Sequence, residues 1–255
     1  MGPPPSGRND GNDVRMSLPK PDIRAILFDK DGTLVDFERT WGTCILRATD
    51  HAAGGDRQLA ERLRALGGYD ARTGRTQADS LFAACNTAEI VDAFAAAGVT
   101  RDPATLVGEL DDIFREASEN AVGLVDTPRL FERLRAAGLR LGIASSDNAA
   151  SIAVTARTLG IADDLAFIAG YDSGYGAKPG PGMFTAFCEA IGEDPRNVAM
   201  VGDNRHDMEM GCRAGAGLRI AVLSGTGTRE RLAPIADVCL PDIAALPDYL
   251  HLDGR

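Results

Sequence analysis

Short runs of apolar residues recur along the chain, and each run ends abruptly in polar residues. The runs are too short for helices, and segments with the spacing of amphipathic helices lie between them. Strands that alternate with helices form a parallel sheet covered by helices on both faces. We therefore predict an α/β fold whose strands cover residues 23–28, 139–145, 165–169, 197–202 and 218–223.

This alternation is interrupted between residues 36 and 126, where helical patterns follow one another without a convincing strand. Helices are predicted over residues 38–51, 56–66, 87–97 and 103–120, and a glycine-rich loop is predicted at residues 67–74. We interpret residues 36–126 as an inserted helical domain. Residues 21–35 and 127–255 then form the α/β core domain, and residues 1–20 form a disordered tail.

The composition limits the classes of partner. The 255 residues include 27 Lys and Arg against 37 Asp and Glu, which gives a formal net charge of −10. Such a chain, without a basic block, is not expected to bind nucleic acid by neutralising phosphates. No run approaches 18 apolar residues, so no membrane span is predicted. The five cysteines form no CxxC pair, so we expect reduced thiols and a cytoplasmic location.

Two pairs of carboxylates follow predicted strands. Asp29 and Asp31 come directly after the first strand in the run DKDGTL, and Asp203 and Asp207 follow the fourth strand in the run GDNRHD. In extended chain, side chains two residues apart point the same way, so Asp29 and Asp31 should face one site. Each run alone also has an ordinary interpretation, an acidic turn for the first and a capped helix N-terminus for the second.

Two further polar motifs follow strands of the same sheet. Ser145 and Ser146 lie where the second strand passes into a helix, and the unpaired amides of a helix N-terminus favour a phosphate group. Lys178 lies in a loop rich in glycine and proline after the third strand. Simple helix capping by the serines and an idle surface lysine are the alternatives.

All of these motifs are predicted at the carboxyl end of one sheet, where open α/β sheets bind their ligands. The aspartates would bring about four negative charges within a few ångströms, an arrangement that needs a divalent cation or raised pKa values. Mg²⁺ is the most plausible cation because it prefers oxygen ligands. The sequence therefore predicts a site for Mg²⁺ and a phosphate group.

The motifs, in this order and spacing, resemble those of the haloacid dehalogenase superfamily of phosphohydrolases. The matching runs are DKDGTL at 29–34, IASS at 143–146, AKPGPGMF around Lys178 and GDNRHD at 202–207. The helical insert lies where that family has its C1 cap, so the chain resembles the phosphoglycolate phosphatase-like subgroup. The resemblance implies a Rossmann-like core and a Mg²⁺-dependent phosphatase that acts on a small phosphorylated metabolite, phosphoglycolate-like or a sugar phosphate.

The resemblance also implies roles in an aspartyl-phosphate mechanism. Asp29 would be the nucleophile that attacks phosphorus. Asp31 would protonate the leaving alcohol and later deprotonate the attacking water. Ser145 and Lys178 would bind the phosphoryl group and contribute to catalysis, and Ser146 would contribute to substrate binding.

A metal site is implied by the same resemblance. Its ligands would be the Asp29 carboxylate, the backbone carbonyl of Asp31 and Asp203, with Asp207 in a supporting role. Because dehalogenases with this fold lack the second aspartate of DKD and the paired acids of GDNRHD, hydrolysis of a carbon–halogen bond is not expected.

Lys30 departs from the family's pattern, in which an apolar residue often separates the two aspartates. In extended chain its side chain should point away from Asp29 and Asp31. Cap residues could contact the leaving group, although surface charge and cap packing would also explain them. These candidates are Arg39, Trp41, Arg72 and Arg75.

Two other functions are compatible with these residues. A sugar phosphomutase would use the same aspartyl-phosphate but return the phosphoryl group to an intermediate. A non-catalytic phosphate-binding module would need neither a nucleophile nor an acid. Either a monomer or a homodimer fits the sequence.

Overall fold

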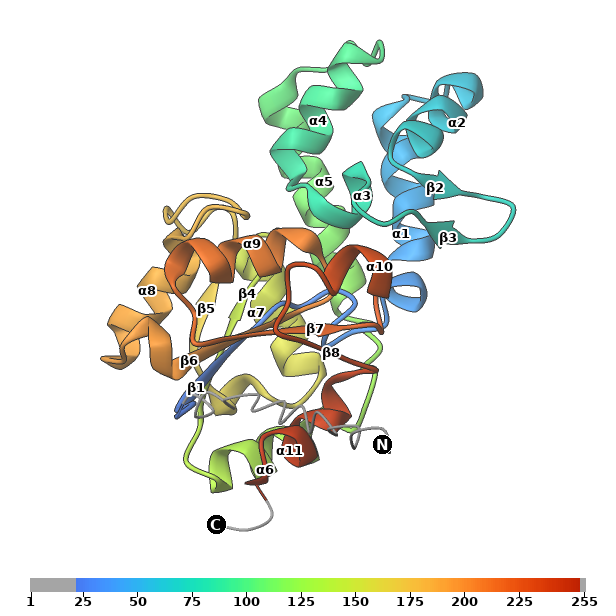
Figure 1. Cartoon of the computed structure of the whole chain (residues 1–255). Coiled ribbons are helices and arrows are strands. Elements are labelled where there is room, and N and C mark those ends of the chain that lie inside the picture. Colours follow the sequence, from blue (N-terminus) through green and yellow to red (C-terminus); the bar gives the residue numbers. More distant parts are fainter. Residues whose placement is uncertain (1–21, 253–255) are drawn as a thin grey trace, which may run out of the picture.

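The structure, a computed structural model, describes residues 22–252, so the predicted tail at residues 1–20 lies outside the described residues. The core is a six-stranded sheet in the order β5-β4-β1-β6-β7-β8, and every neighbouring pair of strands is parallel (Figure 1). The strands are β1 (Ala25–Phe28), β4 (Arg140–Ala144), β5 (Leu165–Ala169), β6 (Val198–Gly202), β7 (Leu218–Val222) and β8 (Val238–Leu240). The predicted α/β fold is confirmed. β8 was not predicted, because a three-residue strand at the sheet edge carries little sequence signal.

Helices cover both faces of this sheet (Figure 1). One face packs against α6 (Thr127–Ala136), α7 (Ala149–Thr158), the 3₁₀ turn Ile243–Ala245 and α11 (Leu246–Tyr249). The other face packs against α8 (Gly182–Ile191), α9 (Arg205–Ala214) and α10 (Arg229–Leu232). Further 3₁₀ turns at Ala162–Asp164 and Pro195–Asn197 precede β5 and β6.

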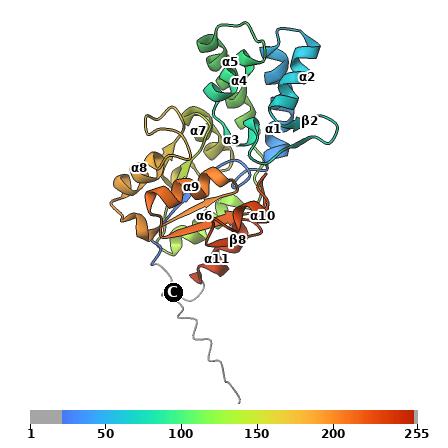
Figure 2. The ribbon, with the colours of Figure 1, turned by 45° about the horizontal axis from the view of Figure 1, so that its top comes forward.

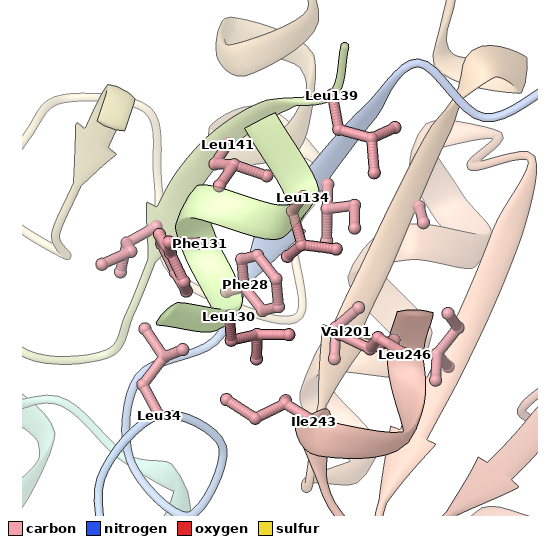
Figure 3. Packing of buried hydrophobic residues seen from close by; sticks show 14 of the residues in the cluster. Phe28, Leu34, Leu130, Phe131, Leu134, Leu139, Leu141, Val201, Ile243 and Leu246 are labelled. Carbon is pink, nitrogen blue, oxygen red and sulfur yellow. The ribbon is translucent and has the colours of Figure 1, made fainter. Parts of the chain in front are cut away.

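The central strand β1 is buried on both faces, which explains its uninterrupted apolar sequence. Ile26 and Phe28 point into the apolar layer between the sheet and α6, whereas Ala25 and Leu27 point into the layer between the sheet and α8. Phe28 stacks on Phe131 of α6 with ring centroids 5.3 Å apart, at the centre of the packing in Figure 3. Because each fully buried side chain of this size stabilises the fold by about 1.5–3 kcal/mol, β1 is fixed in position up to its last residue.

The insert between β1 and α6 contains α1 (Phe37–Ala52), α2 (Arg57–Leu66), α3 (Leu81–Ala84), α4 (Thr87–Ala96) and α5 (Pro103–Ser118). Figure 2 shows these helices standing together beyond one end of the sheet. Asp36, Asp56, Asn86 and Asp102 cap four of them by accepting a hydrogen bond from the backbone three residues on. The helices pack around their own buried apolar residues, which include Trp41 and Phe94.

The expectation that this insert lacks strands is wrong. β2 (Tyr69–Asp70) and β3 (Arg75–Thr76) form a short antiparallel hairpin inside the segment predicted as a loop. Two-residue strands are too short for a periodic pattern, so the sequence shows only their glycine-rich turn. Among residues 22–252, every helix is too short or too polar to cross a bilayer.

Candidate active site

Three of the predicted site residues are the first residues after neighbouring strands. Asp29 follows β1, Ser145 follows β4 and Asp203 follows β6. The register places Phe28 beside both Ile143 and Val201, so these strands end at nearly the same level. Their side chains therefore meet at one edge of the sheet.

A cavity of about 720 Å³, partly open to solvent, lies above this edge. Every site residue predicted from the sequence lines it. These residues are Asp29, Asp31, Ser145, Ser146, Lys178, Asp203 and Asp207. The arrangement supports the prediction that four distant motifs form one site.

Lys178 links two of the aspartates. Its Nζ lies 2.6 Å from Asp29 Oδ1 and 2.6 Å from Asp207 Oδ1, and all three side chains are at least nine-tenths buried. Burial raises the pKa of Asp29 to about 7, although the Lys178 cation opposes this effect. Burial alone would lower the pKa of Lys178, but Asp207 and Asp29 raise it above its ordinary value. The lysine is therefore a fixed positive charge beside the predicted nucleophile.

Asp207 has two tasks at the start of α9. Its Oδ2 accepts a hydrogen bond from the backbone N–H of Asn204, which completes a capping box, while its Oδ1 binds Lys178. The helix-capping interpretation of this aspartate is thus confirmed, and its contact with Lys178 is compatible with the predicted supporting role. The capping box at the start of α9 therefore fixes the Asp207 carboxylate that binds Lys178.

Asp29, Asp203 and Asp207 form a buried acidic group whose ligand atoms lie within 4.8 Å of one another. Lys178 occupies one oxygen of Asp29, and the backbone N–H of Thr226 donates to Asp203 Oδ2 at 2.8 Å. Among the described residues, no hydrogen bond reaches the second oxygen of Asp29 or of Asp203. Burial raises the pKa of Asp203 well above its usual range. Two free carboxylate oxygens with unfavourable burial suit a small divalent cation such as Mg²⁺.

The structure requires glycine at position 32, the glycine of the DKDGTL motif. Its backbone has φ of +79°, and an added Cβ would lie 2.7 Å from Asp203 Oδ2 and 2.7 Å from the Cα of Gly225. Only glycine adopts this conformation and permits this approach without strain. The turn after Asp31 therefore packs directly against the second acidic motif.

The prediction that Lys30 points away from both Asp29 and Asp31 is wrong for Asp31. Its Nζ lies 2.8 Å from Asp31 Oδ1 and 3.1 Å from Asp147 Oδ2, and its side chain is fully buried. The alternation used for the prediction applies only to extended chain, and β1 ends at Phe28. Beyond this point the backbone turns, because Leu34 N–H donates to Lys30 O at 2.8 Å.

Asp31 is held from two sides. Lys30 and the indole Nε1–H of Trp41, at 2.5 Å, both donate to its Oδ1. The Lys30 ammonium also lies 4.5 Å from the centre of the Trp41 ring, a cation–π contact. Among residues 22–252, no hydrogen bond reaches Asp31 Oδ2. Of the cap residues considered from the sequence, Trp41 thus contacts the predicted acid.

Asp147 was not predicted as a site residue. It lies two residues after Ser145 and lines the cavity, and burial raises its pKa to about 6 although the Lys30 cation opposes this effect. Its backbone N–H donates to Ser145 Oγ at 3.1 Å, so the serine proton stays available to an incoming acceptor. The only sequence signal was an aspartate inside a motif interpreted for its hydroxyl groups.

The remaining cap candidates do not reach the cavity. Arg39, Arg72 and Arg75 are exposed and are absent from its lining. Ser146 lines the cavity but donates its hydroxyl hydrogen bond to the backbone oxygen of Ala84, 3.2 Å away in the cap. This serine therefore joins the cap to the core.

Comparison with known proteins defines the class of the chain. Residues 23–215, or 193 of the 255 residues, match the family of haloacid dehalogenase-like hydrolases. A solved structure of a haloacid dehalogenase-like family hydrolase, SP0104 from Streptococcus pneumoniae, has a TM-score of 0.69 at 20% identity, and the match covers 90% of this chain and 99% of that one. CbbY from Rhodobacter sphaeroides, solved in complex with phosphate, has a TM-score of 0.67 at 19% identity, with 88% and 96% covered.

The chain belongs to the haloacid dehalogenase-like hydrolase family. Among curated relatives, a phosphoglycolate phosphatase of Neisseria gonorrhoeae is 34% identical over 117 residues, which are 45% of this chain and 49% of the relative. The pyrophosphatase PpaX of Bacillus velezensis is 25% identical over 91% of this chain and 97% of its own. The chain spans about half the length of the phosphoglycolate phosphatases that it matches.

Proposed function

We propose that this protein is a Mg²⁺-dependent phosphatase that hydrolyses a small phosphomonoester through an aspartyl-phosphate intermediate. The observation that carries the proposal is the buried group of Asp29, Lys178, Asp203 and Asp207 at the base of one cavity. The family match and the phosphatase names of the relatives support the same class of reaction. A location in the cytoplasm and a monomeric or homodimeric state stay predictions.

In the first half-reaction, the Asp29 carboxylate attacks phosphorus and the bond from phosphorus to the ester oxygen breaks. Asp31 gives its proton to the departing alkoxide, so a neutral alcohol leaves. Lys178 stabilises charge on Asp29 and the phosphoryl oxygens, because its Nζ already lies 2.6 Å from Asp29 Oδ1. Ser145 donates a hydrogen bond to a non-bridging oxygen.

In the second half-reaction, Asp31 takes a proton from water, and the oxygen of this water attacks phosphorus. The bond between phosphorus and Asp29 breaks, so inorganic phosphate is released and the free Asp29 carboxylate is restored. The Asp29 carboxylate, the Asp31 carbonyl and Asp203 would hold Mg²⁺, which supplies positive charge for the phosphoryl group when it is bound. Asp207 keeps Lys178 in place.

The test is phosphate release by the Asp29→Asn variant. We expect loss of turnover with a retained fold, because asparagine has nearly the same shape but cannot form the acyl phosphate. Asp112→Asn is the matched control, since Asp112 is an exposed cap residue outside the cavity and should leave turnover unchanged. Full activity of Asp29→Asn would refute the nucleophile, and isomerised sugar phosphate without phosphate release would identify a phosphomutase instead.

A further inference from the structure

The cavity has two chemically different halves. The core supplies a polar floor of seven ionisable residues together with two serines and one asparagine. The cap supplies a wall without a charged side chain. The large apolar side chains of the wall are those of Phe37, Trp41, Ile45, Phe82, Ile90 and Phe114.

The cap lies closed on the core, so this wall faces the space beside a bound phosphoryl group. Ser146 Oγ donates to Ala84 O at 3.2 Å, and Asn204 Nδ2 donates to Ala83 O at 3.4 Å. Both contacts bring α3 onto the loops that follow β4 and β6. With the phosphoryl group on the polar floor, the leaving group has to lie against the cap wall.

Apart from His206, whose buried Nδ1 has no hydrogen-bond partner, no side chain with an unshared positive charge lines the cavity among the described residues. Lys178 is shared by two carboxylates, and Lys30, outside the lining, is shared by Asp31 and Asp147. His206, on the floor, is the one further basic side chain in the lining. A carboxylate or a second phosphate in the leaving group would lose its water beside an apolar surface and five aspartates, and a neutral His206 would offer it no compensating charge.

An uncharged apolar leaving group meets complementary surfaces instead. Trp41 and Phe114, packed edge to face with centroids 5.9 Å apart, contribute aromatic surface to the wall, and Ile45 and Ile90 contribute aliphatic surface. The wall also carries the hydroxyl group of Thr87, which already donates its hydrogen bond to Asp111 Oδ1 at 2.6 Å and so does not donate it to a leaving group.

We infer that the preferred substrate is a phosphomonoester of an uncharged, predominantly apolar alcohol, alkyl or aryl. This inference rests on the proposed phosphatase function and names its substrate class. It sets this protein apart from relatives whose names denote the anionic substrates phosphoglycolate and pyrophosphate.

A series of methyl, ethyl, propyl and butyl phosphates tests the inference. Their alcohols differ little in acidity, so differences in kcat/KM report on the length of the apolar chain. With Mg²⁺ at pH 8, where histidine side chains are ordinarily neutral, kcat/KM should rise about fourfold per methylene, which corresponds to about 0.8 kcal/mol at 1.4 kcal/mol per tenfold. Propyl phosphate and phosphoglycolate form a matched pair of similar size that differs in charge. We expect propyl phosphate to be hydrolysed at least tenfold more efficiently.

Two pairs of variants locate the effect in the wall. Phe82→Arg should raise the ratio of phosphoglycolate to propyl phosphate hydrolysis at least tenfold, because it brings a cation to the cavity. Leu66→Arg adds the same charge on an exposed cap position outside the cavity and should leave that ratio unchanged. Ile45→Ala should reduce the gain from propyl to butyl phosphate, whereas Leu46→Ala, on the same helix but outside the lining, should not.

The outcomes separate this inference from the function on which it rests. If kcat/KM does not rise along the alkyl series, or if phosphoglycolate is hydrolysed more efficiently than propyl phosphate, the apolar substrate class is overturned while the phosphatase function stands. Unchanged ratios in both Phe82→Arg and Ile45→Ala would also overturn it. If neither these esters nor para-nitrophenyl phosphate releases phosphate in the presence of Mg²⁺, the proposed function fails and this inference fails with it.

Discussion

Replacement of Lys30 by methionine should destabilise the protein strongly. The Lys30 side chain is fully buried, and its ammonium compensates the carboxylates of Asp31 and Asp147 at 2.8 and 3.1 Å. Methionine has a similar length but no charge. The variant would therefore leave two carboxylates beside each other in a largely buried site.

The magnitude follows from the burial of the ion pair. Loss of one partner of a buried pair costs about 3–5 kcal/mol of unfolding free energy. For a chain of this size, each kcal/mol corresponds to about 2–4 °C in melting temperature, so Lys30→Met should melt about 10 °C lower. The added variant Lys30→Met/Asp147→Asn removes one of the uncompensated charges and should recover at least half of this loss.

Thermal unfolding followed by circular dichroism measures these differences at constant pH and without added metal. Arg47→Met is the matched control, because Arg47 pairs with Glu116 at the surface, where the side chains are 58% and 46% exposed. Such a pair contributes about 0–1 kcal/mol, so this variant should melt close to the parent protein. Equal melting temperatures for Lys30→Met and Arg47→Met, or no recovery on adding Asp147→Asn, would refute the assignment of Lys30 as a buried counter-ion.

Two further predictions concern the acidic motifs. Gly202→Ala should lower phosphate release at least about tenfold, since its Cβ would lie 2.3 Å from Asp207 Oδ2 and displace this carboxylate; Gly108→Ala, a helical position whose Cβ meets nothing within 4 Å, should keep full activity and gain up to about 1 kcal/mol. Burial raises the pKa of Asp29 to about 7 and that of Asp203 well above its ordinary value, so the folded metal-free protein holds protons that the unfolded chain releases above about pH 4. Its stability should therefore fall as the pH rises from about 4 to 7, and the gain in melting temperature on adding Mg²⁺ should be larger at pH 8 than at pH 5.5; a gain independent of pH would argue against metal binding by these carboxylates.

The sequence predicted the main strands of the core within two residues, because their apolar runs are buried on both faces and end in polar residues. It also predicted that Asp29, Ser145 and Asp203 would lie at one edge. Parallel strands place their carboxyl ends together, so a residue that follows a strand is located once the topology is known. The helix-capping contact of Asp207 was also predictable, because Asp207 lies in the first turn of the helix that follows a strand.

The sequence did not predict where Lys30 points or that Asp147 shares it. The chain leaves the extended conformation at Phe28, and from there the direction of each side chain depends on the turn and on the packing around it. Asp147 looked like an ordinary residue of a helix-initiating loop. Its partner is distant in sequence and becomes its neighbour only through the pairing of β1 with β4.

The character of the cap wall was also decided by the tertiary structure. The sequence offered Arg39 as a candidate for the leaving group, yet α1 turns Phe37, Trp41 and Ile45 toward the cavity and leaves Arg39 exposed. Helical periodicity shows which residues share a face, but not whether this face meets the cap interior or a ligand. Local sequence thus determined the strands and the polar residues at their ends, whereas the docking of the cap on the sheet determined which side chains line the cavity.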